Sequence, residues 1–256
     1  MTSNTIPKKI FQTWESLNIS DNFKSLLDSW KINNPDYEHI LYDKDMRRDF
    51  ISNNFDVDVL CAYDKINPGA FKADLWRYCI LYKYGGFYAD VDTLCFNSIN
   101  KFVNKPNIEF IIPTVLNSCV YKHCLSNGFI GTIPNNPILL QCITQIVHNV
   151  KHGIIPSFNL NICGPGLIGQ KTNIYLGLHE LDSFVGKEGI LNISEGLGPI
   201  KAIHFLCFRE HDEFVTDCKH NMLFQNKNGN SKISNIYEAE CQKCNINSNW
   251  SAFKPY

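Results

Sequence analysis

The chain has 256 residues and a formal net charge of −1, with a mass of 29.3 kDa. This length supports one large domain, or one domain with a small appendage. The balanced charge excludes a basic field for nucleic acid or for an anionic membrane, and the sequence has no run of about 18 apolar residues that could span a bilayer.

The N-terminus is polar and lacks the apolar segment of a signal peptide. We therefore expect a cytoplasmic protein with no membrane anchor. Asn, Ile and Lys are abundant. We interpret this composition as the product of an AT-rich genome, such as that of a large DNA virus whose proteins work in the host cytoplasm.

The first quarter of the chain predicts alternating strands and helices. An apolar and aromatic run after Pro7 favours a strand, and Ser20 or Asp21 can cap the helix that follows. In order, the expected elements are a strand at 8–13, a helix at 20–32, a strand at 37–42 and a charged helix at 44–54.

Apolar residues recur at helical spacing from Ala70 to Tyr84, which predicts a helix. Gly85-Gly86 would end this helix with a left-handed cap, and a strand at 87–91 would follow. Asp74 and Arg77 share another stripe of the helix, which puts a carboxylate and a guanidinium near the end of that strand. The alternative for this pair is an exposed i,i+3 ion pair of small energetic effect.

Later segments continue the pattern and indicate an α/β fold. The polar residues 226–230 are expected to be mobile. The remaining expected elements are a buried strand at 109–112, a helix at 137–150, a tight loop at Gly164-Pro165-Gly166 and a strand at 202–205.

Asp90 and Asp92 flank Val91 at the end of a predicted strand. Residues i and i+2 of an extended segment project to the same side, where two carboxylates repel each other unless a cation lies between them. Hard divalent cations prefer such oxygen ligands. The pair therefore predicts a Mg²⁺ or Mn²⁺ site that can hold a diphosphate. A second pair, Asp56 and Asp58, follows no buried strand, and we interpret it as a solvated helix exit or turn.

Eleven cysteines without a secretory signal are expected to be mainly reduced. Cys61, Cys79, Cys95 and Cys142 have apolar neighbours in the sequence, and we expect them in the core. A C-terminal group contains a Cys-X-X-Cys pair with zinc-ligand spacing, for which zinc, a local disulfide and free thiols all stay open. This group comprises Cys207, Cys218, Cys241 and Cys244, with His204, His211 and His220 nearby.

The segment ending at Asp92 resembles the sugar-binding region of the DXD glycosyltransferases. The shared pattern is Asp74-X-X-Arg77 followed by Leu81-Tyr82-X-X-Gly85-Gly86-X-Tyr88-X-Asp90-X-Asp92. The resemblance is to glycosyltransferase family 32, which includes yeast mannosyltransferases and is related to the glucosylating domains of large clostridial toxins. Residues 6–14 and 34–43 are similar to the first two units of that family.

This resemblance implies a GT-A nucleotide-sugar-binding fold, α/β in class, with a mixed central sheet. It implies that Asp92 binds the metal directly and that Asp90 contacts sugar or ribose hydroxyls and reaches the metal through water. Asp74 and Arg77 would hold the donor sugar and complete the catalytic set. The implied donor-binding set is Phe11, Gln12, Trp14, Ala73, Asp74, Arg77, Tyr88, Asp90, Val91, Ser248 and Trp250.

Within that set the resemblance implies that Trp14 stacks on the base, with an ordinary core position as the alternative. Backbone groups near Phe11 and Gln12 would read the base edge, and Tyr88 would lie against the nucleoside. The loops at Asn127-Gly128 and Gly164-Pro165-Gly166 resemble segments that approach the anomeric centre and the acceptor.

Ser248-X-Trp250 is similar to the end of a mobile loop with the pattern Glu-X-X-Ser-X-Trp in the toxin-like relatives. Asn245 stands at the Glu position, and its amide oxygen is a weaker metal ligand than a carboxylate. His204 or a shifted loop register is the alternative source of this ligand. In a single domain of residues 1–256, residues 226–256 would form a lid, with a polar tail as the alternative. The implied metal set is Asp90, Asp92, Asn245 and Ser248.

The implied activity is metal-dependent, retaining transfer of a hexose from a nucleotide sugar to a saccharide or glycoprotein. UDP-glucose is the first expected donor, ahead of UDP-galactose and GDP-mannose, and Mn²⁺ or Mg²⁺ is the expected cofactor. A nucleotide-sugar hydrolase would share every donor residue. A catalytically silent sugar-binding or interaction module would bind without turnover. Nucleic acid is not an expected partner, and a homodimer is left open.

Overall fold

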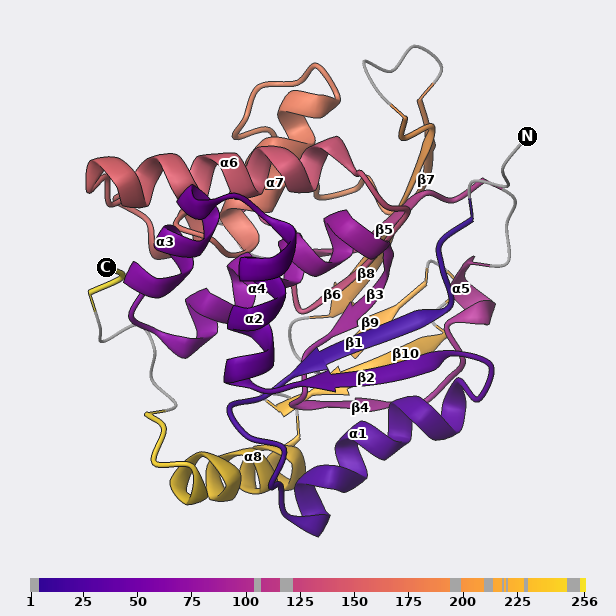
Figure 1. Cartoon of the computed structure of the whole chain (residues 1–256). Helices are drawn as coiled ribbons and strands as arrows, with labels where there is room; N and C mark the ends of the chain where they lie inside the picture. The colour runs from indigo at the N-terminus through magenta and orange to yellow at the C-terminus, as the bar shows by residue number, and fades with distance from the viewer. Residues whose placement is uncertain are drawn as a thin grey trace.

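The structure is a computed structural model that describes residues 5–103, 107–115, 122–193, 199–209, 214–217, 219, 221–227, 230–247 and 254–256. Figure 1 shows helices and strands interspersed along the chain. The strands are β1 (Lys9–Thr13), β2 (Glu38–Tyr42), β3 (Gly86–Ala89), β4 (Thr93–Cys95), β5 (Phe110–Val115), β6 (Phe129–Thr132), β7 (Gly189–Asn192), β8 (Ala202–Arg209), β9 (Phe214–Thr216) and β10 (Met222–Asn226). The helices are α1 (Asp21–Asn33), α2 (Lys44–Asn54), α3 (Val57–Lys65), α4 (Gly69–Tyr84), α5 (Asn100–Val103), α6 (Pro137–His152), η1 (Asn159–Asn161), α7 (Pro165–Tyr175) and α8 (Ser231–Lys243). Within the described ranges, none of these helices combines the length and apolarity that crossing a bilayer requires.

Ten strands of the described residues form one mixed sheet in the order β2-β1-β3-β6-β5-β8-β9-β10-β4, with β7 paired to β8. β1 runs parallel to both β2 and β3, whereas β3 and β6 are antiparallel. The order brings β1 and β3 together at the centre of one half of the sheet. The predicted α/β fold with a mixed central sheet is confirmed.

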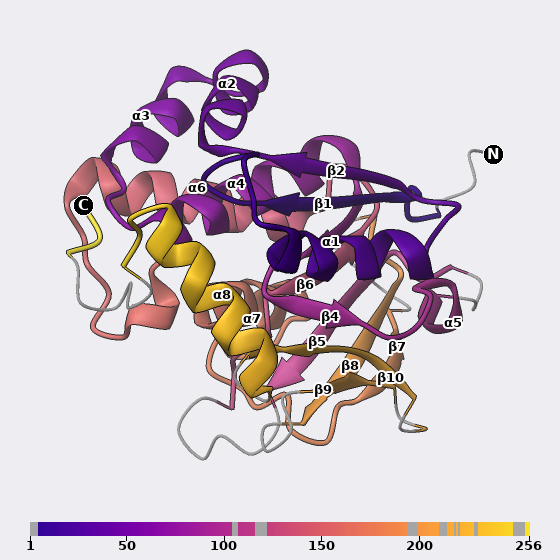
Figure 2. The same ribbon diagram turned by 90° about the horizontal axis from the view of Figure 1, so that it is seen from below.

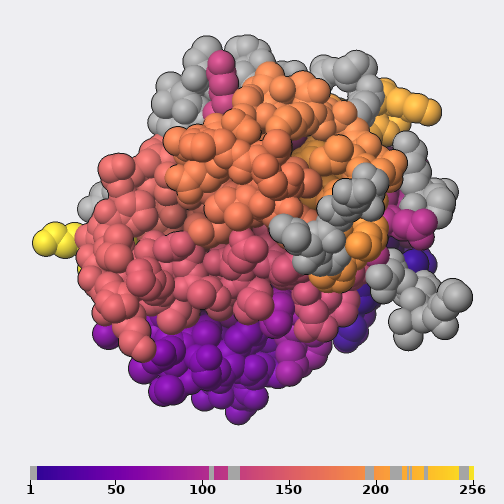
Figure 3. Space-filling view, turned by 90° about the horizontal axis from the view of Figure 1, so that it is seen from above, coloured from indigo at the N-terminus to yellow at the C-terminus, as the bar shows by residue number. Residues whose placement is uncertain are grey.

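Both faces of the central strands are buried. Successive side chains of a strand point to opposite faces, so Phe87 of β3 packs beside α1 while Tyr88 packs beneath α4. Helices α2, α3, α4, α6 and α7 gather on one side of the sheet (Figure 1). In the space-filling view, α6, α7 and the segment after them lie side by side over that side (Figure 3). Burial on both faces explains why every residue of β3 is buried.

A third apolar cluster joins the ends of β1 and β3 to α1 and α8. It includes Trp14, Phe23, Val91 and Ile233. Helices α1 and α8 lie side by side in the view from below (Figure 2). The burial of Val91 in this cluster anchors the turn that carries the two flanking aspartates.

Most predicted elements of the first half coincide with observed ones. The predicted cap of the first helix is confirmed, because the Ser20 hydroxyl accepts a hydrogen bond from the Phe23 amide (3.3 Å). The strands and helices predicted between residues 8 and 91 correspond to β1, α1, β2, α2, α4 and β3, and those predicted at 109–112, 137–150 and 202–205 correspond to β5, α6 and β8.

Two loop predictions are wrong, and both segments begin helices. Gly164 precedes α7, and Pro165 takes its first helical position, where the missing N–H of proline has no partner to lose. Asp56 begins α3 rather than ending a helix, because its carboxylate accepts a hydrogen bond from the Val59 amide (3.0 Å). The predicted mobile segment 226–230 begins at the last residue of β10, and residues 228 and 229 lie outside the described ranges.

Cys79, Cys95 and Cys142 are buried as predicted, but Cys61 is exposed. Helix α3 packs through Val59, Ala62 and Tyr63, which leaves Cys61 on its outer side. In the C-terminal group, Cys241 is a buried free thiol and Cys244 a partly exposed one. Cys218, His211 and His220 lie outside the described residues, and no metal-holding group of three or more side chains occurs among those that are described.

Gly131 of β6 lies between β3 and β5 in the sheet. A Cβ atom at this position would overlap the side chains of Phe87 and Ile111. Gly131→Ala is therefore expected to lower the free energy of unfolding by about 1–3 kcal/mol, a usual cost of overpacking a core, as measured by urea unfolding. The Gly131→Ala, Phe87→Leu double variant should recover part of the loss. A single variant as stable as wild type would contradict this packing.

Candidate active site

The Asp-X-Asp segment forms the turn between β3 and β4. The Asp90 backbone carbonyl accepts hydrogen bonds from the Thr93 hydroxyl (2.5 Å) and from the side-chain amide of Gln12 (3.3 Å). The Asp90 amide donates to the Gly128 carbonyl (2.8 Å). Contacts from β1, β4 and the residue before β6 therefore fix the backbone of this turn.

The Asp90 carboxylate is held between two donors. Its Oδ1 atom accepts a hydrogen bond from the Tyr88 hydroxyl (2.7 Å) and lies 3.2 Å from Arg77 Nη2. A Cβ atom on Gly128 would lie 2.6 Å from Asp90 Oδ2, so a glycine is needed there. Burial raises the pKa of Asp90 to about 6, against the opposing effect of Arg77. Asp90 is thus a carboxylate whose surroundings supply too little positive charge.

Arg77 links this turn to helix α4. Its Nη2 atom lies 3.2 Å from Oδ1 of Asp74 as well as from Oδ1 of Asp90, and its Nη1 atom donates to the Asn127 carbonyl (2.7 Å). The guanidinium also lies 4.2 Å from the centre of the Tyr88 ring. The ion pair between Arg77 and Asp74 is buried. The alternative prediction, an exposed i,i+3 ion pair of small energetic effect, is therefore wrong.

Asp74 is buried and held from several directions. The side-chain amide of Asn127 donates to Asp74 Oδ1 (2.8 Å), and the Cys163 thiol donates to Asp74 Oδ2 (3.2 Å). Burial raises the pKa of Asp74, and Arg77 opposes that shift. The sequence did not indicate that Asn127 and Cys163 would meet Asp74. The only available signal was that a buried carboxylate requires donors from somewhere in the fold.

Asp92 has a cationic partner that sequence reasoning missed. Lys227 Nζ lies 2.8 Å from Asp92 Oδ2. The same ammonium lies 3.5 Å from the centre of the Tyr237 ring on α8. Lys227 is far from Asp92 in the sequence, so no local pattern could have joined them.

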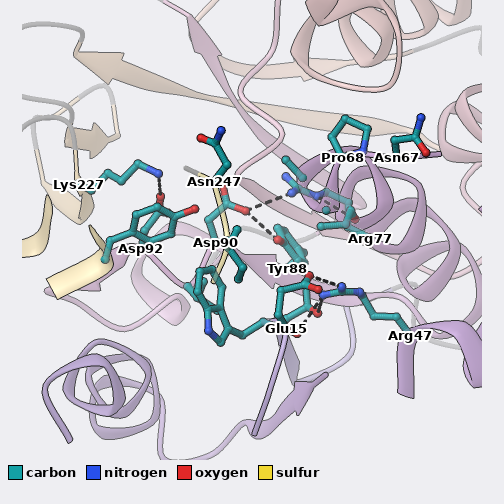
Figure 4. A pocket seen from close by; sticks show the side chains of 18 residues that line it. Glu15, Arg47, Asn67, Pro68, Arg77, Tyr88, Asp90, Asp92, Lys227 and Asn247 are labelled. Carbon is teal, nitrogen blue, oxygen red and sulfur yellow. Dashed lines mark hydrogen bonds and ion pairs between the residues drawn. The ribbon is translucent and has the colours of Figure 1, made fainter. Parts of the chain in front are cut away.

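The aspartates lie between two adjoining cavities of about 370 and 480 Å³. We call the smaller one the Trp14 lobe and the larger one the Asp74 lobe. Figure 4 shows the Trp14 lobe, with Arg77, Asp90, Asp92 and Lys227 turned toward it. The residues shared by both lobes are Ala70, Arg77, Asp90, Asp92 and Lys227. A ligand that spans both lobes must therefore pass these charged groups.

Most of the predicted donor-binding residues lie in this double cavity. Trp14, Ala73, Tyr88 and Val91 line the Trp14 lobe. The Trp14 side chain is 7% exposed and packs on Phe23 and Tyr237, so base stacking stays a prediction. The predicted loop residues Asn127, Gly128, Gly164 and Pro165 line the Asp74 lobe.

Other predicted residues lie behind or beside the cavity. Phe11 is a core residue, and buried Gln12 supports the Asp90 carbonyl. Asn245 is not part of the described lining: it is exposed and takes a left-handed conformation (φ 53°) just after α8. Asparagine suits that conformation, and Asn247 lines the Trp14 lobe instead. Ser248 and Trp250 lie outside the described residues.

The oxygen atoms of Asp90 and Asp92 fit a hard divalent cation. Mg²⁺ and ions like it are commonly held by one or two protein carboxylates together with phosphate oxygens and water. The raised pKa of Asp90 agrees with this fit, because a bound cation would supply the positive charge that the buried carboxylate lacks.

Arg77 neutralises two buried carboxylates, so Arg77→Met should lower the free energy of unfolding by about 3–5 kcal/mol at pH 8. Without the guanidinium, Asp74 and Asp90 would have pKa values still further above those of the unfolded chain. Protonation of these two carboxylates would then favour the folded state. The difference in free energy of unfolding between the variant and wild type should therefore shrink as the pH falls from 8 to 5.

Urea unfolding of both proteins across this pH range measures the effect. Arg48→Met is the matched control, since it removes an exposed bidentate pair with Asp64 (2.8 Å for each contact). Its deficit should be about 1 kcal/mol or less at every pH. An Arg77→Met deficit that stays constant from pH 8 to pH 5 would contradict the assigned charge balance.

Residues 20–109 match the family model described as "Glycosyltransferase sugar-binding region containing DXD motif". The chain is 30% identical over 152 residues to inositol phosphoceramide mannosyltransferase 2 of Schizosaccharomyces pombe, covering 59% of this chain and 41% of that protein. It is 35% identical over 102 residues to an uncharacterized glycosyltransferase of Acanthamoeba polyphaga mimivirus, covering 40% of this chain and 39% of that protein. The chain thus spans less than half the length of these curated relatives.

Among solved structures, the PaToxG glycosyltransferase has a TM-score of 0.49 at 21% identity, with 66% of this chain and 68% of that chain covered. The catalytic domain of the Clostridium novyi alpha-toxin has a TM-score of 0.42 at 14% identity, with 69% and 64% covered. The matched region 20–109 contains Asp74, Arg77, Asp90 and Asp92. The family model and the curated relatives show that the chain is a homologue of glycosyltransferases, and its residues 20–109 match the sugar-binding region that contains the DXD motif.

Proposed function

We propose that the protein is a metal-dependent, retaining glycosyltransferase of the GT-A type that transfers a hexose from a nucleotide sugar. The observation that supports this most strongly is the position of Arg77, which joins Asp74 to Asp90 at the wall between the two lobes. A nucleotide sugar has its diphosphate between nucleoside and sugar, and so matches a double cavity whose charged groups lie in the middle.

In this proposal the nucleoside lies in the Trp14 lobe and the sugar in the Asp74 lobe. The buried Asp74 carboxylate would accept hydrogen bonds from sugar hydroxyls, while Asn127 and Arg77 keep it oriented. Its negative charge also lies on the side where positive charge develops on the sugar ring as the bond to the leaving group breaks.

Asp90 and Asp92 would hold the Mg²⁺ or Mn²⁺ ion, which when bound neutralises the charge of the leaving diphosphate. Tyr88 and Arg77 fix the Asp90 carboxylate, so that Asp90 itself would need little reorganisation on metal binding. The described residues 227, 237, 246 and 247 of the C-terminal segment line the same lobe. They support the proposal that residues 226–256 cover the bound donor within one catalytic domain.

Two observations point to different donor sugars. The sequence resemblance favours UDP-glucose, whereas the curated relatives include proteins named as mannosyltransferases. A screen should therefore compare UDP-glucose, UDP-galactose and GDP-mannose. The proposed acceptor is a saccharide or glycoprotein, and the relatives' names add inositol phosphoceramide to the acceptors worth screening. The mimivirus relative supports the proposed viral origin.

Asp92→Asn should reduce nucleoside diphosphate release from the preferred donor at saturating Mn²⁺ by more than tenfold, because it removes charge from the metal site. Circular dichroism should show an unchanged fold. The matched control is Asp58→Asn, which alters the exposed second Asp-X-Asp pair on α3 and should retain wild-type activity. If Asp92→Asn keeps more than about a tenth of the wild-type rate, Asp92 is not a required metal ligand.

Asp74→Asn should lower donor turnover by about tenfold or more but leave the affinity for the free nucleoside diphosphate within about twofold, because Asp74 would contact only the sugar. The asparagine keeps the shape of the buried side chain, so the variant should still fold. Kinetics and calorimetry measure the two quantities. A large loss of diphosphate affinity would place Asp74 at the nucleotide instead.

The same assays separate the alternatives. A nucleotide-sugar hydrolase would release sugar at a rate that no acceptor increases. A silent binding module would bind the nucleoside diphosphate with Mn²⁺ and release no sugar from any of the three donors.

A further inference from the structure

Strand pairing fixes the position of Lys227. β10 runs antiparallel to β4, and Asn226 is opposite Thr93. Continuing this register by one residue places Lys227 opposite Asp92. The pair is therefore set by the sheet and does not depend on a chance meeting of two surface side chains.

The surroundings of the ammonium are partly buried. Lys227 and Asp92 side chains are 25% and 15% exposed, and Nζ lies 2.8 Å from Asp92 Oδ2. The ammonium also lies 3.5 Å from the centre of the Tyr237 ring, a favourable position for a cation over an aromatic face. Lys227 lines both lobes, and Figure 4 shows it directed at Asp92.

Two other cations line the described cavity, and both are committed elsewhere. Arg77 lies between Asp74 and Asp90 and also donates to a backbone carbonyl. Arg47 is buried and pairs with Glu15 (2.5 Å). Lys227 differs from both, because its flexible four-carbon stem allows the ammonium to move and its carboxylate partner is a predicted metal ligand.

A divalent cation and an ammonium on the same carboxylate repel each other, because like charges a few ångströms apart are costly in a partly buried site. A metal held by Asp92 would therefore compete with Lys227 for that carboxylate. The diphosphate of a bound donor would lie beside the same site, and the displaced ammonium could donate to it.

We propose that Lys227 is a built-in counter-cation of the site: it occupies Asp92 without metal, competes with the metal for that carboxylate, and then binds the donor's diphosphate. This inference rests on the proposed function. It assigns Lys227 two effects of opposite sign, since the residue weakens the binding of metal alone and strengthens the binding of metal with nucleotide.

The test compares wild type with Lys227→Met, which keeps the apolar stem on Tyr237 and removes the charge. Mn²⁺ alone, followed by electron paramagnetic resonance, should bind the variant about threefold to tenfold more tightly. GDP or UDP with Mn²⁺, followed by calorimetry, should bind about tenfold more weakly, as expected for the loss of one charge-assisted hydrogen bond. Guanosine and uridine, which lack phosphate, should bind both proteins equally.

Two further variants control for folding and for charge in general. Lys227→Arg keeps the charge and should stay within about threefold of wild type in both measurements. Lys72→Met removes a lysine that also lies over a tyrosine ring, 5.0 Å from the centre of Tyr63, but does not line either described lobe. It should change neither affinity.

The inference is overturned if Lys227→Met moves the Mn²⁺ and diphosphate affinities in the same direction, or changes neither. It is also overturned if Lys227→Arg loses diphosphate binding as fully as Lys227→Met. A wild-type protein that binds neither nucleoside diphosphate with Mn²⁺ rejects the proposed function itself, and that result is distinct because it does not depend on position 227.

Discussion

The site depends on one buried guanidinium. Arg77 lies within 3.2 Å of carboxylate oxygens of both Asp74 and Asp90 and donates to the Asn127 carbonyl. It ties helix α4, the turn after β3 and the segment before β6 to one charge. Two buried carboxylates this close would be very unfavourable without a cation between them. The charge of Arg77 therefore lets Asp74 and Asp90 lie close together between the two lobes.

The two aspartates of the turn are held differently. Gly128 leaves room for the Asp90 carboxylate, and buried Val91 anchors the turn from the opposite side. Asp92 has a different environment, because its partner Lys227 has a flexible stem and follows β10, which pairs with the strand that Asp92 precedes. Asp90 is thus rigidly held, whereas the pairing of Asp92 can change when a ligand arrives.

The sequence was sufficient for the part of the site that is local in the chain. Helical spacing placed Asp74 and Arg77 on one stripe, and Gly85-Gly86 with the following strand placed Asp90 next to them. The confirmed Ser20 cap and the confirmed strands of the first half have the same origin, because each depends on residues within a few positions. The region that matches the family model, residues 20–109, contains this local pattern.

Features that depend on distant segments could not be read in the same way. The contact between Lys227 and Asp92 follows from the register of β10 on β4, which no spacing in the sequence encodes. The sequence predicts a loop at Gly164-Pro165-Gly166, although proline is also favoured at the first position of a helix. The resemblance implies that Asn245 is a metal ligand, yet it takes the left-handed position after α8.

In the proposed function, one ligand spans both lobes, with its diphosphate at Asp90 and Asp92. A crystal structure with Mn²⁺ and a non-transferable analogue of UDP-glucose or GDP-mannose tests this binding mode most directly. We expect the nucleoside in the Trp14 lobe, the metal on Asp92 and the sugar beside Asp74. A donor confined to one lobe, or a metal with no contact to either aspartate, would contradict the account.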